Sequence, residues 1–157
     1  MKNDRITLRF LAEPTDVNFG GKVHGGSVMK WIDQAGYTCA VNWCSNYCVT
    51  VYVGGIRFLQ PIFIGNIVEV KARLLHTGRS SMHIAVDIHA TDPQSRTITK
   101  TTHCVIVFAA VDNAGKTIEV PKWIPETEEE IKLNQYVLKL VDLRKNIAEE
   151  MKDFVID

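Results

Sequence analysis

Residues 27–43 carry apolar side chains at the spacing of an α-helix. At about 100° per residue, the apolar positions of this segment fall on one broad arc: Val28, Ile32, Ala35, Gly36, Cys39, Ala40 and Trp43. Lys30, Gln34 and Thr38 fall on the opposite side, and Asp33 lies at the edge of the apolar arc. The pattern predicts a long helix that is buried along one face, with a carboxylate where that face meets water.

After this helix the chain alternates between apolar and polar residues, which is typical of β-strands. One strand is expected before the helix and four after it, at residues 6–10, 48–58, 67–75, 80–90 and 97–111. Gly54 and Gly55 interrupt the second of these strands, which indicates a bulge or a place of close backbone approach. Because turn-forming residues keep the connections short, consecutive strands are expected to pair antiparallel, and a curved sheet would cover the helix. The predicted fold class is α+β, with a curved antiparallel sheet wrapped around one long central helix.

A second helix is expected near the C-terminus. Thr127 and Glu130 match a capping box at its start. A stripe of apolar residues follows at helical spacing, interrupted by Arg144: Leu133, Val137, Leu140, Ile147 and Met151. The stripe predicts that this helix packs on the outside of the domain or against another subunit. We therefore expect a core domain over residues 1–125 and a C-terminal helical extension over residues 126–157.

The composition is that of one globular domain. The chain has 157 residues, of which 46% are hydrophobic and 23% are charged. Its formal net charge of zero gives no general attraction to nucleic acid or to an anionic membrane, so neither is expected as a partner. The first residues lack the apolar core of a signal peptide, and no apolar run reaches membrane-spanning length. A cytoplasmic location is therefore expected.

The cysteines do not point to a metal centre. Four are present and none fits a zinc-ribbon spacing: Cys39, Cys44, Cys48 and Cys104. Free buried thiols in a reducing compartment are expected, and a metal site built from Cys44, Cys48 and His24 is the weaker alternative. We expect neither a metal nor a cofactor.

Gly25 and Gly26 stand where the first helix is expected to begin. The N-terminus of a helix presents unpaired N–H groups and a partial positive charge, and glycine lets a ligand approach the backbone. One short segment would therefore supply an oxyanion-type donor set and, about two turns later, the carboxylate of Asp33. The alternative is a loop that leads into a buried helix, with Asp33 merely solvated. The local pattern leaves both interpretations open.

Four features follow one another in a recognisable order. They are a loop with Pro14, Asp16, Asn18, Gly21, Gly25 and Gly26, a helix that reaches Asp33, a turn of sequence Gly78-Arg79-Ser80-Ser81, and a strand end at residues 107–115. Together they resemble the acyl-CoA thioesterases of the hotdog fold, and most closely the YciA-like and cytosolic acyl-CoA hydrolase branch. The resemblance extends over roughly residues 5–121. The fold that it implies, a central helix wrapped by an antiparallel sheet, agrees with the periodicity.

The resemblance implies hydrolysis of an acyl-CoA to a carboxylic acid and CoA. The site would lie between two subunits, in a dimer or in a hexamer made of three dimers. Asp33 would be the general base or, as an alternative, the nucleophile, and Asn18 would orient the water or bind the thioester carbonyl. The N–H groups of Gly25 and Gly26 would stabilise the oxyanion.

The resemblance also suggests residues that contact the substrate. CoA, present only as part of substrate and product, would contact the turn formed by Gly78, Arg79, Ser80 and Ser81; the alternative is a plain hairpin turn with a solvated arginine. Thr50 would line the acyl or pantetheine channel, and the alternative is ordinary sheet core. His24 would line the substrate or pack in the loop, because the family accepts other residues there, including phenylalanine.

Two other functions are considered. A dehydratase or hydratase of the same fold would use a histidine and a carboxylate, but the His-Phe-Pro run typical of such enzymes is missing here. A non-catalytic acyl-CoA-binding module would have no need of both Asn18 and Asp33. Hydration of an enoyl-CoA, or binding without thiol release, would distinguish these alternatives from a thioesterase.

Overall fold

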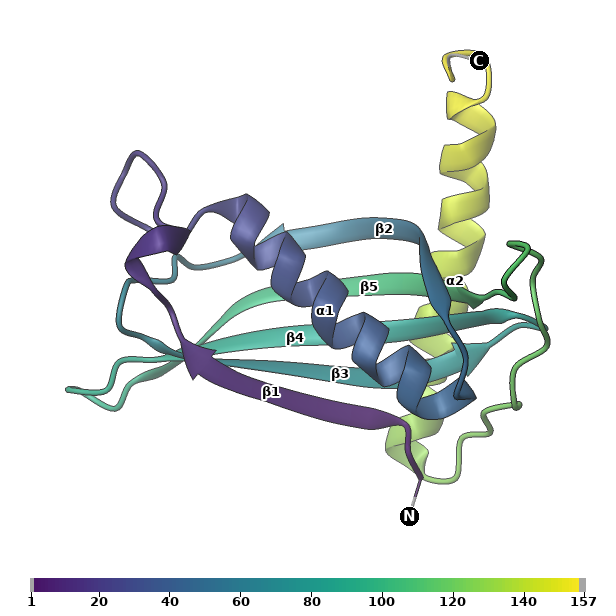
Figure 1. The fold of residues 1–157 in the computed structure, drawn as a ribbon, viewed down its shortest axis with the longest axis horizontal. Helices are drawn as coiled ribbons and strands as arrows, with labels where there is room; N and C mark the ends of the chain where they lie inside the picture. The colour runs from purple at the N-terminus through teal and green to yellow at the C-terminus, as the bar shows by residue number, and fades with distance from the viewer. Residues whose placement is uncertain (1, 156–157) are drawn as a thin grey trace.

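A five-stranded antiparallel sheet with one helix on each face makes up the protein (Figure 1). The computed structural model describes residues 2–155. The strands run in the spatial order β1-β3-β4-β5-β2, and a 3₁₀ turn, Pro14–Asp16, follows β1. Their bounds are β1 Arg5–Leu11, β2 Cys48–Phe58, β3 Ile67–Thr77, β4 Ser81–Thr91 and β5 Ile98–Ala110. The helices are α1, Gly25–Cys44, and α2, Glu128–Met151, so the α+β hotdog architecture expected from the sequence is confirmed.

Helix α1 lies along one face of the sheet, and its predicted apolar arc is the buried one (Figure 1). Ile32, Ala35 and Cys39 are almost completely buried against the sheet. Gly36 permits the closest approach, because an added Cβ would lie 2.7 Å from the Phe108 ring. The helix begins two residues earlier than predicted, since the side chain of His24 caps it.

Strands β1 and β2 form the two edges of the sheet. Strand β2 is 11 residues long and is irregular at two places, between Thr50 and Tyr52 and between Gly54 and Arg57. The second irregularity confirms the bulge predicted at the glycine pair. The outer edge of β2 leaves backbone N–H and C=O groups without a neighbouring strand, which is the arrangement that lets one sheet continue into another.

Helix α2 covers the opposite face of the sheet and crosses the strands at a steep angle (Figure 1). Thr127 caps its start by accepting a hydrogen bond from the N–H of Glu130, as the sequence predicted. Val137 of this helix is completely buried. His103 on β5 lies 2.8 Å from Asp87 on β4 and 2.8 Å from the hydroxyl of Tyr136, so it joins the sheet to the helix.

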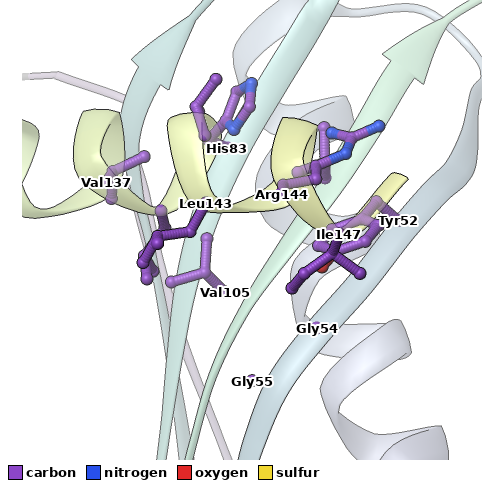
Figure 2. A pocket seen from close by; sticks show the side chains of 12 residues that line it. Tyr52, Gly54, Gly55, His83, Val105, Val137, Leu143, Arg144 and Ile147 are labelled. Carbon is purple, nitrogen blue, oxygen red and sulfur yellow. The ribbon is translucent and has the colours of Figure 1, made fainter. Parts of the chain in front are cut away.

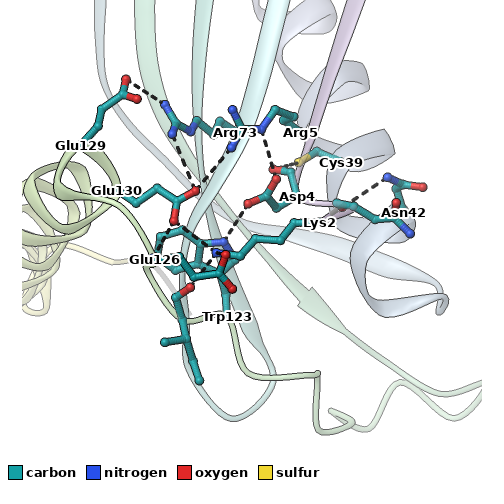
Figure 3. Close-up of polar contacts among 12 residues, drawn as sticks. Lys2, Asp4, Arg5, Cys39, Asn42, Arg73, Trp123, Glu126, Glu129 and Glu130 are labelled. Carbon is teal, nitrogen blue, oxygen red and sulfur yellow. Dashed lines mark hydrogen bonds and ion pairs between the residues drawn. The ribbon is translucent and has the colours of Figure 1, made fainter.

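Polar contacts with the N-terminal segment fix the start of α2 (Figure 3). The buried carboxylate of Glu130 accepts a hydrogen bond from Lys2 at 3.1 Å and pairs with Arg5 at 3.4 Å. Asp4 is also buried and accepts a hydrogen bond from the indole of Trp123 at 3.0 Å. Because the hydrogen bond from the N–H of Glu126, together with that of Lys2, favours the ionised form, the pKa of Glu130 is lowered.

Candidate active site

The loop before α1 is held in shape by Asn18. The side-chain oxygen of Asn18 accepts hydrogen bonds from the N–H groups of Gly20 at 2.8 Å and Lys22 at 3.1 Å. The amide nitrogen of the same side chain has no hydrogen-bond partner among residues 2–155. Asn18 therefore uses its acceptor for the loop and keeps two N–H donors for a ligand.

The two glycines at the start of α1 differ in what their N–H groups do. The N–H of Gly26 donates to Nδ1 of His24 at 2.9 Å, so the histidine is the N-cap of the helix. The N–H of Gly25 has no partner within the part of the chain that the structure describes. Of the two oxyanion donors predicted from the sequence, Gly25 is free in this arrangement, and Gly26 becomes free only when the His24 ring moves. The capping role of His24 was not predicted, although a polar residue just before a helix start is a signal for it.

A cavity of about 270 Å³ connects Asn18 with Gly25. Its remaining walls come mainly from apolar side chains, among them Val28, Phe58 and Ile62. The two residues with unpaired donors thus line a mostly apolar cavity, where hydrogen bonds to a developing negative charge are stronger than in water.

Asp33 lies elsewhere, on the side of α1 that faces β2. One carboxylate oxygen of Asp33 accepts a hydrogen bond from the hydroxyl of Thr50 at 2.6 Å. Neither residue lines the cavity beside Asn18. Both are exposed, and α1, β2 and the link between them carry further exposed apolar side chains: Met29, Tyr47, Val51 and Val53. Asp33 is thus an exposed carboxylate beside the open edge of the sheet, held by one hydrogen bond from β2.

The turn at residues 78–81 joins β3 to β4 at the end of the sheet opposite the loop that precedes α1 (Figure 1). Its backbone is closed by a hydrogen bond from the N–H of Gly78 to the carbonyl of Ser81, and the carbonyl of Ser80 accepts from Ala110 at 3.0 Å. The Arg79 side chain is exposed and donates to the hydroxyl of Thr117 at 3.0 Å. Because Ala110 pairs with the first residue of β2, the turn lies near the Thr50 end of that strand.

The alternative prediction of a metal site at Cys44, Cys48 and His24 is wrong. The two cysteines lie at the far end of the 20-residue helix α1 from His24, roughly 30 Å away at 1.5 Å per residue. All four cysteines are free and buried, as the sequence predicted. The sulfur atoms of Cys44 and Cys48 lie 3.5 Å apart, and burial together with Cys44 raises the pKa of Cys48 to about 12.

Neither helix within residues 2–155 is long and apolar enough to cross a membrane.

The groups predicted to form the site occupy three places in one chain: the donor cavity, the Asp33 and Thr50 pair, and the turn at Arg79.

Comparison with known proteins places the chain among thioesterases. Residues 20–97 match the thioesterase superfamily. The acyl-CoA thioester hydrolase YciA of Salmonella typhimurium is 33% identical over 119 residues, which are 74% of this chain and 90% of that protein. A cytosolic acyl coenzyme A thioester hydrolase of Rattus norvegicus is 32% identical over 129 residues, which are 80% of this chain and 34% of that protein.

Two solved structures extend the comparison. An acyl-CoA hydrolase from Staphylococcus aureus, in complex with butyryl coenzyme A, coenzyme A and coenzyme A disulfide, is 27% identical with a TM-score of 0.87, covering 96% of this chain and 92% of that one. Variants of it have been solved in which one aspartate, one asparagine or one threonine is replaced by alanine. A hexameric thioesterase from Yersinia pestis is 34% identical with a TM-score of 0.71, covering 78% of this chain and 99% of that one.

Proposed function

This chain belongs to the acyl-CoA thioester hydrolases of the thioesterase superfamily, and we propose that it hydrolyses acyl-CoA with Asp33 as the general base. The observation that carries the proposal is the hydrogen bond of 2.6 Å from Thr50 to Asp33. It fixes the orientation of an exposed carboxylate at the open edge of the sheet. A base held in one orientation can remove a proton from a water molecule at a defined place.

The spacing of three residues supports these roles. The asparagine, aspartate and threonine that are replaced in the Staphylococcus aureus variants stand in the same order and at the same separations as Asn18, Asp33 and Thr50 here. The variant at the asparagine was solved in complex with coenzyme A. We therefore assign Asn18 and Asp33 to catalysis and give Thr50 the role of positioning Asp33.

The reaction follows from these assignments. Asp33 takes a proton from water, and the resulting hydroxide attacks the thioester carbonyl carbon. The negative charge moves to the carbonyl oxygen, where the N–H of Gly25 and the amide of Asn18 stabilise it; Gly26 adds a third donor when the His24 ring moves aside and lines the acyl group. The carbon–sulfur bond then breaks, and the CoA thiolate takes up the proton that Asp33 had accepted. Loss of one such donor costs about a hundredfold in rate in comparable sites.

A second subunit would bring the two halves together. If two β2 strands pair antiparallel, each copy places its donor cavity, which lies near the end of β2, beside the start of the other copy's β2. Asn18 and Gly25 of one subunit then face Asp33 and Thr50 of the other. Such pairing also covers the exposed apolar residues around Asp33 and satisfies the free edge of β2.

The same pairing suggests where CoA binds. The turn that contains Gly78, Arg79, Ser80 and Ser81 lies near the Thr50 end of β2, so it is on the Asp33 side of the shared site. Arg79 is exposed and forms no ion pair among residues 2–155. A guanidinium with turn N–H groups and hydroxyls suits the phosphates or the pantetheine of CoA.

The wider assembly is proposed as a hexamer of three dimers, as the relative from Yersinia pestis is hexameric. Residues 1–125 would form the catalytic domain and residues 126–157 its C-terminal extension. We propose a cytoplasmic location, because the rat relative is cytosolic and acyl-CoA is the substrate of that relative.

Complementation between two inactive variants tests the proposal. Asn18→Ala and Asp33→Asn are each expected to release little thiol from a panel of acyl-CoA esters, while each stays folded. When the two are co-expressed and assemble at random, about a quarter of the sites combine an intact Asn18 with an intact Asp33, and about a quarter of the wild-type activity returns. No recovery in assemblies shown to contain both chains would mean that the two residues act within one subunit. No thiol release by the wild-type protein across the panel would refute hydrolysis itself.

A further inference from the structure

Helix α2 extends past the edge of the sheet. It begins beside β3, where Arg73 pairs with Glu129 at 3.2 Å, and later crosses β2, where the Arg144 guanidinium lies 4.3 Å from the centre of the Tyr52 ring. Beyond Arg144 the helix continues to Met151, and Figure 1 shows this end projecting past β2. The projecting part is about 10 Å long at 1.5 Å per residue, which equals about two strand spacings in a sheet.

The apolar stripe that packs on the sheet continues along this projecting end. At about 100° per residue, Val137, Arg144 and Met151 lie within about 40° of one another on the helix surface, and Ile147 lies next to them. Val137 is completely buried, whereas Ile147 is 49% exposed and Met151 is 55% exposed. The same face of the helix therefore changes from buried to exposed at the point where the sheet ends.

An apolar pocket of about 140 Å³ opens at the same place (Figure 2). Gly54 and Gly55 of β2 lie on one side of it, and Ile147 of α2 lies on the other. Tyr52 also lines the pocket and lies against the Arg144 guanidinium, so side chains of β2 and α2 meet there. The pocket and the exposed stripe thus form one continuous apolar surface at the edge where β2 has no neighbour.

We propose that the end of α2, residues 144–151, packs on the sheet of a second copy of this chain that is joined through β2. A sheet continued by the partner's β2 lies in the plane of this sheet, so it lies directly beneath the projecting stripe. Two strand spacings carry Met151 over the partner's β2 and the strand beside it. The twofold relation places the partner's α2 across the open pocket in return, and each helix becomes a strap across the seam between subunits.

The inference rests on the β2 dimer of the proposed function and goes beyond it. Strand pairing alone joins the two sheets edge to edge, and the proposed catalytic groups lie on the face that α1 covers. The strap joins the same two subunits on the other face of the sheet. Removal of the strap is therefore expected to weaken the dimer while every catalytic residue is kept.

Dilution experiments on matched variants test the strap. Ile147→Glu with Met151→Glu places two charges on the exposed stripe, and Asn146→Glu places one on the far side of the same turn as the control. Sedimentation velocity over a dilution series is expected to show the dimer of the double variant dissociating at a concentration at least about a hundredfold higher than wild type, because several half-exposed apolar side chains lose their partner surface. The Asn146→Glu protein is expected to behave as wild type. Equal dissociation of all three proteins, with unchanged circular dichroism, would overturn the proposal.

Activity separates this inference from the proposed function. The double variant is expected to lose thiol release on dilution and to regain it when concentrated, because only the dimer holds a complete site. Asp33→Asn is expected to be inactive at every concentration. A double variant that dissociates while its specific activity stays constant would refute the shared site and leave the strap in place, whereas full activity with unchanged dissociation would refute the strap alone.

Discussion

Replacement of Thr50 by valine is the most informative single change. Valine has nearly the shape of threonine and lacks only the hydroxyl, so Thr50→Val removes the hydrogen bond of 2.6 Å to Asp33 and little else. Thr50 is exposed on an edge strand in the single chain, and the change is expected to leave the unfolding free energy nearly unaltered. The effect should appear in catalysis, because the carboxylate loses the group that orients it.

The expected size follows from the kind of hydrogen bond. A hydrogen bond to a charged group contributes about 1.5–3 kcal/mol, and the exposure of both residues in one subunit favours the lower end of that range. A loss of about 1.5 kcal/mol corresponds to roughly tenfold in rate, and the upper end to about a hundredfold. Because Thr50 acts through Asp33, the decrease is expected in kcat at nearly constant KM.

Thiol release from one acyl-CoA, followed at several concentrations, measures both constants. Thr50→Ser keeps a hydroxyl at the same place and is expected to restore most of the activity. Thr38→Val is the matched control, because the Thr38 hydroxyl donates to the carbonyl of Gln34 at 2.8 Å within the same helix that carries Asp33. If Thr50→Val turns over as fast as Thr38→Val, the hydroxyl does not position the base. An increase in KM at constant kcat would instead assign Thr50 to substrate binding.

Two further predictions concern stability. Gly36→Ala is expected to lower the unfolding free energy by roughly 1–2 kcal/mol in a urea titration, because the added Cβ would lie 2.7 Å from the Phe108 ring and the overpacking outweighs the better helix propensity; an unchanged midpoint would refute this contact. Burial opposes ionisation of Asp87, but hydrogen bonds from His103 and Lys100 lower its pKa to about 2. Since this pKa is below the ordinary value of about 3.9, the ionised carboxylate stabilises the fold above about pH 4, and that stability is lost as the pH falls towards 2. Asp87→Asn is therefore expected to be roughly 1–2 kcal/mol less stable at pH 7 and to lose less stability between pH 4 and pH 2, and parallel pH profiles for the two proteins would contradict it.

Periodicity predicted the fold because both faces of the sheet and one face of each helix are buried by the same chain. The apolar arc from Val28 to Trp43 and the alternation along the strands each identify a buried face from residues that are close together in the sequence. The ends of elements were less accurate, since they depend on single contacts such as the cap formed by His24. The position of α2 was left open between the outside of the domain and another subunit. The apolar stripe of α2 does not show how much of the helix packs on the sheet of its own chain.

The residues proposed for the site were named through resemblance and spacing, and the resemblance also implied a site between two subunits. The local pattern alone placed the donors of Gly25 and Gly26 in the same short segment as Asp33, and it did not show whether they face the same cavity. The structure puts Asn18 beside Gly25 and leaves Asp33 with Thr50 at the sheet edge. The shared site that we propose leaves no local signal in the sequence, because the contacts that would complete it belong to another copy of the chain. The side chain that Asp33 contacts is 17 residues away on β2, and only the fold brings it there.

Strand β2 serves two purposes that depend on each other. On one face of the sheet it holds Thr50 against Asp33, and on the other it forms the floor of the pocket beneath α2. A change at Ile147, which is far from the chemistry, is therefore expected to reach the active site through the subunit equilibrium alone. That effect disappears at high protein concentration, whereas a change at Thr50 persists at every concentration. The concentration dependence of activity thus distinguishes residues that assemble the site from residues that work within it.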